Sequence, residues 1–284
     1  MSTPDIPSLR DPWLIAAFEG WNDAADAATG VVDHLIEEWD AEVLIQLDPE
    51  DYYDFQVHRP VLRSGPDETG SRLRWPQPTI YYARPAGAVR DVLLVSAPEP
   101  NYRWRSFCEA ILGVAAAAGV SEVLTLGALL ADSPHTRPVP ISGSSNELSD
   151  RLIPGVDASR YTGPVGITTA LTEAATQAGL PALSLWAAVP HYLAEPPCPK
   201  ATLALLGAVE DAFALALPQG VLDELSEAWQ RGAEDALDGD EEITEYVRAL
   251  ESERDESELP QASGDAIARE FERYLRRRQS GDGL

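Results

Sequence analysis

The chain has 284 residues, of which 44% are hydrophobic and 24% charged, and 47 acidic against 21 basic residues give a net charge of −26. This length predicts one large domain or two smaller ones, and the composition is typical of globular rather than disordered proteins. Because a uniformly acidic surface repels phosphate backbones and anionic lipids, we expect no nucleic-acid partner and no membrane partner.

The cysteines and the N-terminal residues exclude further classes. Cys108 and Cys198 belong to no C-x-x-C pair, which argues against zinc ribbons and thioredoxin-type chemistry. Residues 1–12 contain neither a basic n-region nor an apolar h-region, and no apolar run is long enough for a membrane span. We therefore expect a cytoplasmic protein that carries no cofactor and no metal.

Apolar runs typical of buried strands alternate with helical patterns over residues 10–217, often with a glycine between helix and strand. This rhythm predicts an α/β domain with a mainly parallel sheet covered on both faces. Prolines and glycines between residues 58 and 85 separate three short runs, which predict antiparallel strands or a hairpin attached to that sheet. The predicted strands are 13–18, 43–47, 61–63, 72–75, 79–83, 92–95, 123–126 and 183–189, and the predicted helices are 22–39, 104–118, 146–152, 167–178 and 201–217.

The remaining residues, 218–284, are predicted to form an acidic helical region that follows the α/β domain. Between Asp238 and Glu258 the chain carries ten acids and two arginines. This run predicts a solvated helix face or a partly ordered loop, and the alternative is an acidic binding tail. Isolated helices are marginal, so the apolar stripes must pack against the domain or another subunit. The three stripes are Leu222, Leu225, Trp229 and Ala236; Ile243, Tyr246, Val247 and Leu250; and Ile267, Phe271, Tyr274 and Leu275.

Candidate chemistry lies where predicted strands end, because function gathers at the carboxyl ends of parallel strands. The first such segment contains Asn22 and Asp23, next to helix amides that could meet an anion or a carbonyl. Asp23 and Asp26 stand three positions apart and could hold a divalent metal. Capping of the helix from Asn22 or Asp23 is the favoured interpretation of these side chains.

Two further polar segments follow later strands. Asp132, His135 and Arg137 lie in a proline-rich loop, in which the imidazole could act as a general base and the guanidinium could bind an anion. His191 and Tyr192 follow the last predicted strand and could complete a pocket with that loop. The alternative is that these groups only tie the loop down by hydrogen bonds, and the serines of 142–145 cap a helix that begins near residue 146.

Strong catalytic motifs are missing from the sequence. Neither a G-x-S-x-G nucleophile elbow nor a glycine-rich phosphate motif occurs. Neither cysteine has a histidine nearby in the sequence, which argues against a catalytic thiol. The residues alone therefore predict an α/β protein with a candidate polar site, and they assign no reaction.

Several strings in a fixed order resemble the actinobacterial branch of the PAC2 family, named for the eukaryotic proteasome assembly chaperone 2. The resemblance covers about residues 10–217, with the helical region as an extension typical of this branch. The strings are EGWNDA at 19–24, LGALLAD at 126–132, PHTRP at 134–138, GPVGI at 163–167, SLWAAVPHY at 184–192 and PKATLALL at 199–206.

The resemblance implies an α/β/α sandwich with a mixed, mainly parallel twisted sheet similar to that of purine nucleoside phosphorylases. It also implies self-association, with a trimer favoured. Eukaryotic and archaeal relatives bind proteasome α-subunits, and some dock through a C-terminal hydrophobic–Tyr–any motif. Residues 280–284 lack that motif, so we do not expect this chain to bind proteasome α-subunits in that way.

Two functions from different classes follow. The favoured one is a non-enzymatic oligomeric scaffold or chaperone-like protein whose helical region recognises a protein partner. The alternative is a small-molecule-binding protein or an enzyme related in fold to nucleoside phosphorylases or hydrolases. Its pocket would be lined by six candidate residues, namely Asn22, Asp23, Asp132, His135, Arg137 and His191.

Overall fold

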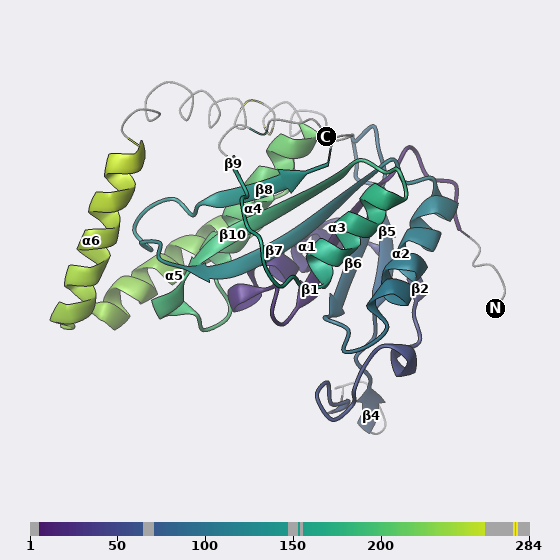
Figure 1. Cartoon of the computed structure of the whole chain (residues 1–284), viewed down its shortest axis with the longest axis horizontal. Coiled ribbons are helices and arrows are strands. Elements are labelled where there is room, and N and C mark those ends of the chain that lie inside the picture. The colour runs from purple at the N-terminus through teal and green to yellow at the C-terminus, as the bar shows by residue number, and fades with distance from the viewer. Residues whose placement is uncertain are drawn as a thin grey trace.

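A mixed sheet of eight strands forms the centre of the molecule, in the order β2-β5-β6-β1-β7-β10-β8-β9 (Figure 1). The computed structural model describes residues 6–64, 71–146, 153, 156–258, 275 and 277. The four central strands, β6, β1, β7 and β10, are parallel, and antiparallel pairs join β5 to both β2 and β6, and β8 to β10. The strands are β1 Trp13–Glu19, β2 Glu42–Gln46, β5 Thr79–Ala83, β6 Val92–Pro98, β7 Glu122–Ala131, β8 Ile141–Ser145, β9 Val156–Ala158 and β10 Ala182–Pro190.

Helices cover both faces of this sheet, which makes the α/β/α sandwich. Successive residues of a strand point to opposite faces, so Ile15 packs in the cluster formed with α1 and α4, whereas Leu14 packs in the cluster formed with α2 and α3. Both faces are apolar, which is why the central strands are continuous apolar runs in the sequence. The helices are α1 Ala27–Glu38, α2 Trp104–Ala118, α3 Ile167–Gln177 and α4 Pro199–Phe213.

The predicted mixed, mainly parallel sheet is therefore confirmed, while the similarity to purine nucleoside phosphorylases stays a prediction. The helix predicted from residue 22 begins only at Ala27, after a short 3-10 turn at Ala24–Asp26. Ala25 and Asp26 have φ angles of 52° and 54°, a left-handed conformation that interrupts the helix at this point. The start of the predicted helix was therefore wrong by one turn.

The segment between residues 58 and 85 divides between two sheets. β5 joins the main sheet in antiparallel pairing, as predicted. The other two runs form a separate two-stranded ribbon, β3 Val61–Ser64 with β4 Ser71–Arg74, which stands away from the main sheet (Figure 1). The predicted hairpin exists, but its attachment to the main sheet was wrong.

The serine-rich run after residue 140 is the strand β8 rather than a helix cap. Gly143 is required there, because a Cβ at this position would lie 2.8 Å from Cγ1 of Val156 and 3.1 Å from Cδ2 of Leu185. The Nδ2 of Asn146 donates to Thr176 Oγ1 and to the Leu180 carbonyl, at 3.1 and 2.9 Å. The rest of the predicted helix, 147–152, lies outside the described residues.

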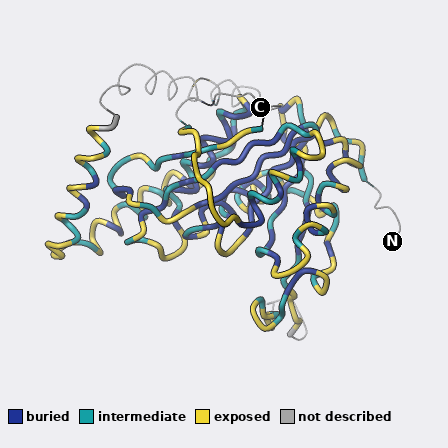
Figure 2. The backbone as a smooth tube through the Cα atoms, in the orientation of Figure 1, coloured by how far each residue is buried: buried dark blue, intermediate teal, exposed yellow. Residues whose placement is uncertain are grey.

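Two helices follow the sandwich: α5 Leu222–Leu237 packs along α4, and α6 Glu241–Glu258 stands at the edge of the molecule (Figures 1 and 2). Leu222 of α5 is part of the buried core, and Val247 and Leu250 of α6 are buried as well. The acidic run is thus helical. Of the third predicted stripe, Ile267, Phe271 and Tyr274 lie outside the described residues. None of the described helices combines the length and the apolar character that crossing a bilayer requires.

Candidate functional site

The structure divides the six candidate residues into two groups. Asn22 and Asp23 follow β1, at a bridge that joins Asp23 to Ala128 in the middle of β7. The other four, Asp132, His135, Arg137 and His191, gather where β7 and β10 end and where α6 packs on the body. A single pocket lined by all six residues stays a prediction.

Asn22 and Glu99 form a polar contact at the start of α3. The Asn22 amide is fully buried, and its Nδ2 donates to Glu99 Oε1 at 2.7 Å. The same oxygen accepts the backbone N–H of Ile167 at 2.9 Å, so the Glu99 carboxylate already occupies the positive end of α3. Gly166 is required beside them, because a Cβ there would lie 1.9 Å from Asn22 Oδ1.

Asp23 caps the helix that follows it. Its carboxylate accepts the N–H groups of Ala28 and Thr29, at 2.6 and 3.2 Å, and the Thr29 hydroxyl. Burial raises the pKa of Asp23 to about 6, although these hydrogen bonds act in the opposite direction. Asp26, the other acid of the metal hypothesis, is exposed. The described residues contain no group of three or more side chains placed to hold a metal ion.

Arg137 binds two acids of α6. Its Nε and Nη2 donate to the two carboxylate oxygens of Asp255 at 2.9 and 2.8 Å, the bidentate geometry that suits a guanidinium. Its Nη1 donates to Glu251 Oε1 at 3.1 Å, and the hydroxyl of Thr136 donates to the same oxygen. The guanidinium proposed as an anion site therefore already holds the acidic helix.

Asp132 and His191 meet α6 nearer its start, at Tyr246. The Tyr246 hydroxyl donates to Asp132 Oδ1 at 2.9 Å, and His191 Nδ1 lies 3.2 Å from the same oxygen. The Tyr246 ring stands edge-on to the rings of His191 and Tyr192, with centroids 5.6 and 6.0 Å apart. These contacts form an aromatic cluster that holds the start of α6 against the end of β10.

His135 is the one candidate that is buried between the body and the helical region. Its Nδ1 lies 3.0 Å from the Tyr192 hydroxyl, which also accepts the His135 backbone N–H. Lys200, the single lysine of the chain, donates to the His135 carbonyl and to Gln230 Oε1 of α5. Burial, and then the charge of Lys200, lower the pKa of His135, so the imidazole is neutral near pH 7.

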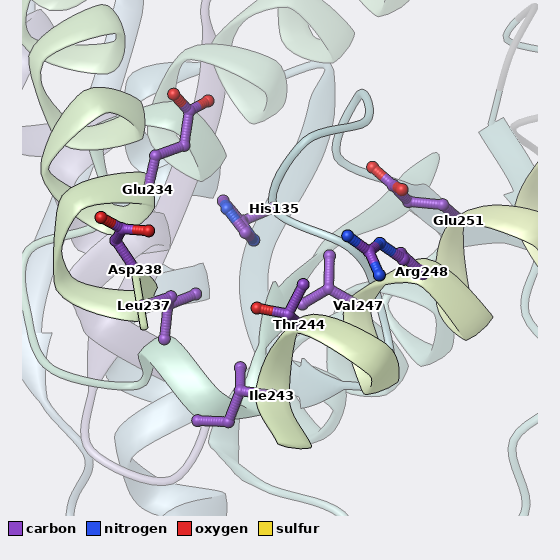
Figure 3. Close-up of a pocket in the computed structure, with 9 residues that line it drawn as sticks. All are labelled: His135, Glu234, Leu237, Asp238, Ile243, Thr244, Val247, Arg248 and Glu251. Atoms are coloured by element: carbon purple, nitrogen blue, oxygen red, sulfur yellow. The ribbon is translucent and has the colours of Figure 1, made fainter. Parts of the chain in front are cut away.

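A cavity of about 260 Å³ lies between the His135 loop, the end of α5 and α6 (Figure 3). The His135 ring projects between the two helices, and no hydrogen bond joins its Nε2 to the described part of the chain. Three acids and one arginine make the lining acidic overall. The lining residues are His135, Glu234, Leu237, Asp238, Ile243, Thr244, Val247, Arg248 and Glu251.

This arrangement offers a neutral imidazole, a hydroxyl and carboxylates, but no activated nucleophile. Both cysteines are buried and lie elsewhere in the fold. Burial raises the pKa of the Cys108 thiol to about 11 and also raises that of Cys198, which keeps both thiols protonated and unreactive. The cavity is therefore suited to hydrogen bonding rather than to covalent chemistry.

The partners that α6 and Arg277 supply were not predicted from the sequence. Glu251 and Asp255 stand four positions apart, a spacing that places two acids on one helix face and could have indicated a shared cation. Arg277 has no such signal: its Nε and Nη2 donate to the two oxygens of Glu210, at 3.2 and 2.6 Å. Glu210 lies on α4 and is fully buried, so this pair anchors the C-terminal residues to the sandwich.

Comparisons with known proteins place this architecture in a family. The model of the PAC2 family matches residues 17–237. A PAC2 family protein from Streptomyces avermitilis is 49% identical, with a TM-score of 0.77, and the match covers 84% of this chain and 100% of that one. A search of curated proteins found no match.

Two further solved structures extend the comparison. A proteasome-assembly chaperone homologue from Mycobacterium tuberculosis is 47% identical, with a TM-score of 0.75 over 83% of this chain and 99% of that one. PbaB, an archaeal proteasome activator from Pyrococcus furiosus, is 18% identical and shares the fold, with a TM-score of 0.65 over 82% of this chain and 96% of that one. The chain is a member of the PAC2 family.

Proposed function

We propose that this chain is a non-enzymatic, oligomeric scaffold or chaperone-like protein that recognises a protein partner through its helical region, α5 and α6. One observation carries the proposal. The polar side chains where β7 and β10 end are bonded to α6, so the groups that would form a reaction centre instead present an acidic helix at the edge of the molecule.

The relatives support the same class of function. The Mycobacterium tuberculosis protein, at 47% identity, is described as a proteasome-assembly chaperone homologue. Binding another protein during assembly requires an exposed, recognisable surface rather than a reaction centre. Self-association as a trimer, residence in the cytoplasm and a division near residue 217 between the α/β domain and the helical region are further parts of this proposal.

Native mass spectrometry of the full chain, purified gently from its own host, tests the proposal. We expect an oligomer that carries a protein partner in a fixed ratio. The double substitution Arg137→Ala and Tyr246→Ala removes contacts of α6 with the body, and we expect it to lose the partner while the sandwich stays folded. Arg105→Ala, at an exposed position of α2 outside the helical region, is the matched control. A partner that the double variant retains contradicts a role of α6 in recognition.

One observation favours a second candidate, a small-molecule-binding protein. The buried His135 lines the cavity between α5 and α6, and its Nε2 has no hydrogen bond to the residues that the structure describes (Figure 3). Arg137 is paired with two acids, so this candidate calls for a neutral or cationic ligand rather than the anion of a phosphorolytic enzyme. A bare oligomer with one small ligand per chain, lost on His135→Ala, would support this candidate against the scaffold.

A further inference from the structure

The β3–β4 ribbon exposes large apolar side chains on one face. Leu62 and Leu73 are directly paired across the ribbon and are 66% and 49% exposed. Trp75 continues the same face beyond β4, with 44% of its surface exposed, and its ring stands edge-on to that of Phe55. Together these four side chains define the apolar face of the ribbon.

Phe55 packs against the core, whereas Leu62, Leu73 and Trp75 keep about half or more of their surface exposed, and the ribbon stands away from the sandwich (Figures 1 and 2). A two-stranded ribbon is marginally stable in water unless it packs against something. Exposed contiguous apolar side chains on a soluble protein mark a surface that binds another molecule. The ribbon therefore needs a partner for its apolar face.

Charge indicates what kind of partner fits. Between residues 59 and 74 the sequence holds four arginines, at positions 59, 63, 72 and 74, against two acids, at 67 and 68. The rest of the chain holds 17 basic and 45 acidic residues. The ribbon is thus a basic segment on a strongly acidic chain, and a second copy of the chain supplies the opposite charge.

The start of α5 offers the complementary surface. Val221 and Leu225 stand four positions apart and are 62% and 47% exposed. The acids Asp223 and Glu224 lie beside them and are also exposed. This gives an apolar centre with an acidic edge, the counterpart of the apolar face with its arginines. In Figure 1 the ribbon projects from the sheet well apart from α5, so we expect the contact between two copies rather than within one chain.

We propose that the β3–β4 ribbon of one copy docks on the exposed start of α5 in the next copy. The two surfaces differ, so the contact is head-to-tail, and such contacts form closed rings when the rotation between copies allows it. This inference rests on the self-association that is part of the proposed function. It adds the surfaces through which the copies would meet.

Sedimentation velocity of the full chain, with native mass spectrometry for the subunit count, tests the docking. We expect the wild-type protein to be an oligomer and Leu62→Asp to weaken association by about tenfold or more, since a central apolar contact is replaced by a charge. The control is Val89→Asp, a substitution of an 83% exposed residue outside both surfaces. Circular dichroism confirms that both variants are folded.

A charge exchange tests the α5 half of the proposal. Arg74→Glu and Glu224→Arg should each weaken association, and the two substitutions combined should restore it. An oligomer that Leu62→Asp leaves intact would overturn the docking while self-association stands. A wild-type protein that stays monomeric would refute self-association itself. Failure of the combined charge exchange to restore the oligomer would overturn α5 as the site.

Discussion

Helix α6 and the β3–β4 ribbon both lie at the periphery of the sandwich, but they differ in their contacts with it. The acids of α6 meet Arg137, and Tyr246 meets Asp132 and the rings that follow β10. The β3–β4 ribbon instead leaves the side chains of Leu62 and Leu73 largely exposed to solvent. The polar residues at the strand ends therefore hold α6 on the body, while the ribbon keeps an exposed apolar surface.

The largest expected effect concerns the anchor at the C-terminal side of the helical region. Arg277→Ala leaves the fully buried Glu210 without its guanidinium partner, so we expect the free energy of unfolding to fall by about 3 kcal/mol. Urea unfolding measures the change. Combining Arg277→Ala with Glu210→Gln removes the buried charge and should recover part of the loss. A loss below about 0.5 kcal/mol would contradict the anchoring role.

Breaking the contact between Arg137 and α6 should lower the free energy of unfolding by less. Arg137→Ala removes a bidentate pair with Asp255 and a bond to Glu251. Because the guanidinium is a third exposed, solvent weakens the pair, and we expect a loss of about 1 kcal/mol in urea unfolding. Arg248→Ala, whose side chain has no bond to the described residues, is the matched control and should change stability by less than about 0.5 kcal/mol. Equal losses of stability in Arg137→Ala and Arg248→Ala would contradict a stabilising contact between Arg137 and α6.

The free energy of unfolding should fall in acid because of His135, which is buried between the body and the helical region. Burial and Lys200 lower its pKa below the usual 6.5, so the folded protein keeps a neutral imidazole while the unfolded chain takes up a proton. Stability from this group is complete above about pH 6.5 and is lost as the pH falls. His135→Gln should therefore reduce the acid sensitivity of urea unfolding between about pH 7 and pH 5. The raised pKa of Asp23 gives the opposite slope in both proteins and cancels. Identical pH profiles would contradict this account.

The ribbon should show the smallest effect on the stability of the isolated chain. Leu73 is half exposed, so Leu73→Ala should change the free energy of unfolding by less than about 0.5 kcal/mol when the protein is dilute enough to be monomeric. The same substitution should weaken self-association. A loss as large as that of Arg277→Ala would show that the ribbon supports the fold rather than a contact between copies.

The sequence predicted the sandwich well because its signals are local. The helix expected at 104–118 matches α2, and the central parallel strands are apolar runs buried on both faces. The strand β8 was missed because Gly143 and its serine neighbours carry the composition of a loop. Pairing across the sheet, which no local pattern encodes, decided the conformation of this segment.

The sequence indicated four residues that lie together in the structure, but it did not indicate the side chains that they contact. Asp132, His135, Arg137 and His191 do gather at one place, as strand ends in a parallel sheet should. The partners of Arg137 and Asp132 come from a helix more than 110 residues later in the chain. Such distant pairing has no signature in spacing, so the sequence suggested a ligand where the structure has its own helix.

The central claim is that the polar loop after β7 holds α6 on the body. Hydrogen exchange of the full chain, read by mass spectrometry, tests it most directly in wild type and in the Arg137→Ala, Tyr246→Ala double variant. We expect faster exchange over residues 241–258 in the double variant, with β1, β7 and α1 unchanged. Exchange in α6 that is equally slow in both proteins would contradict the claim.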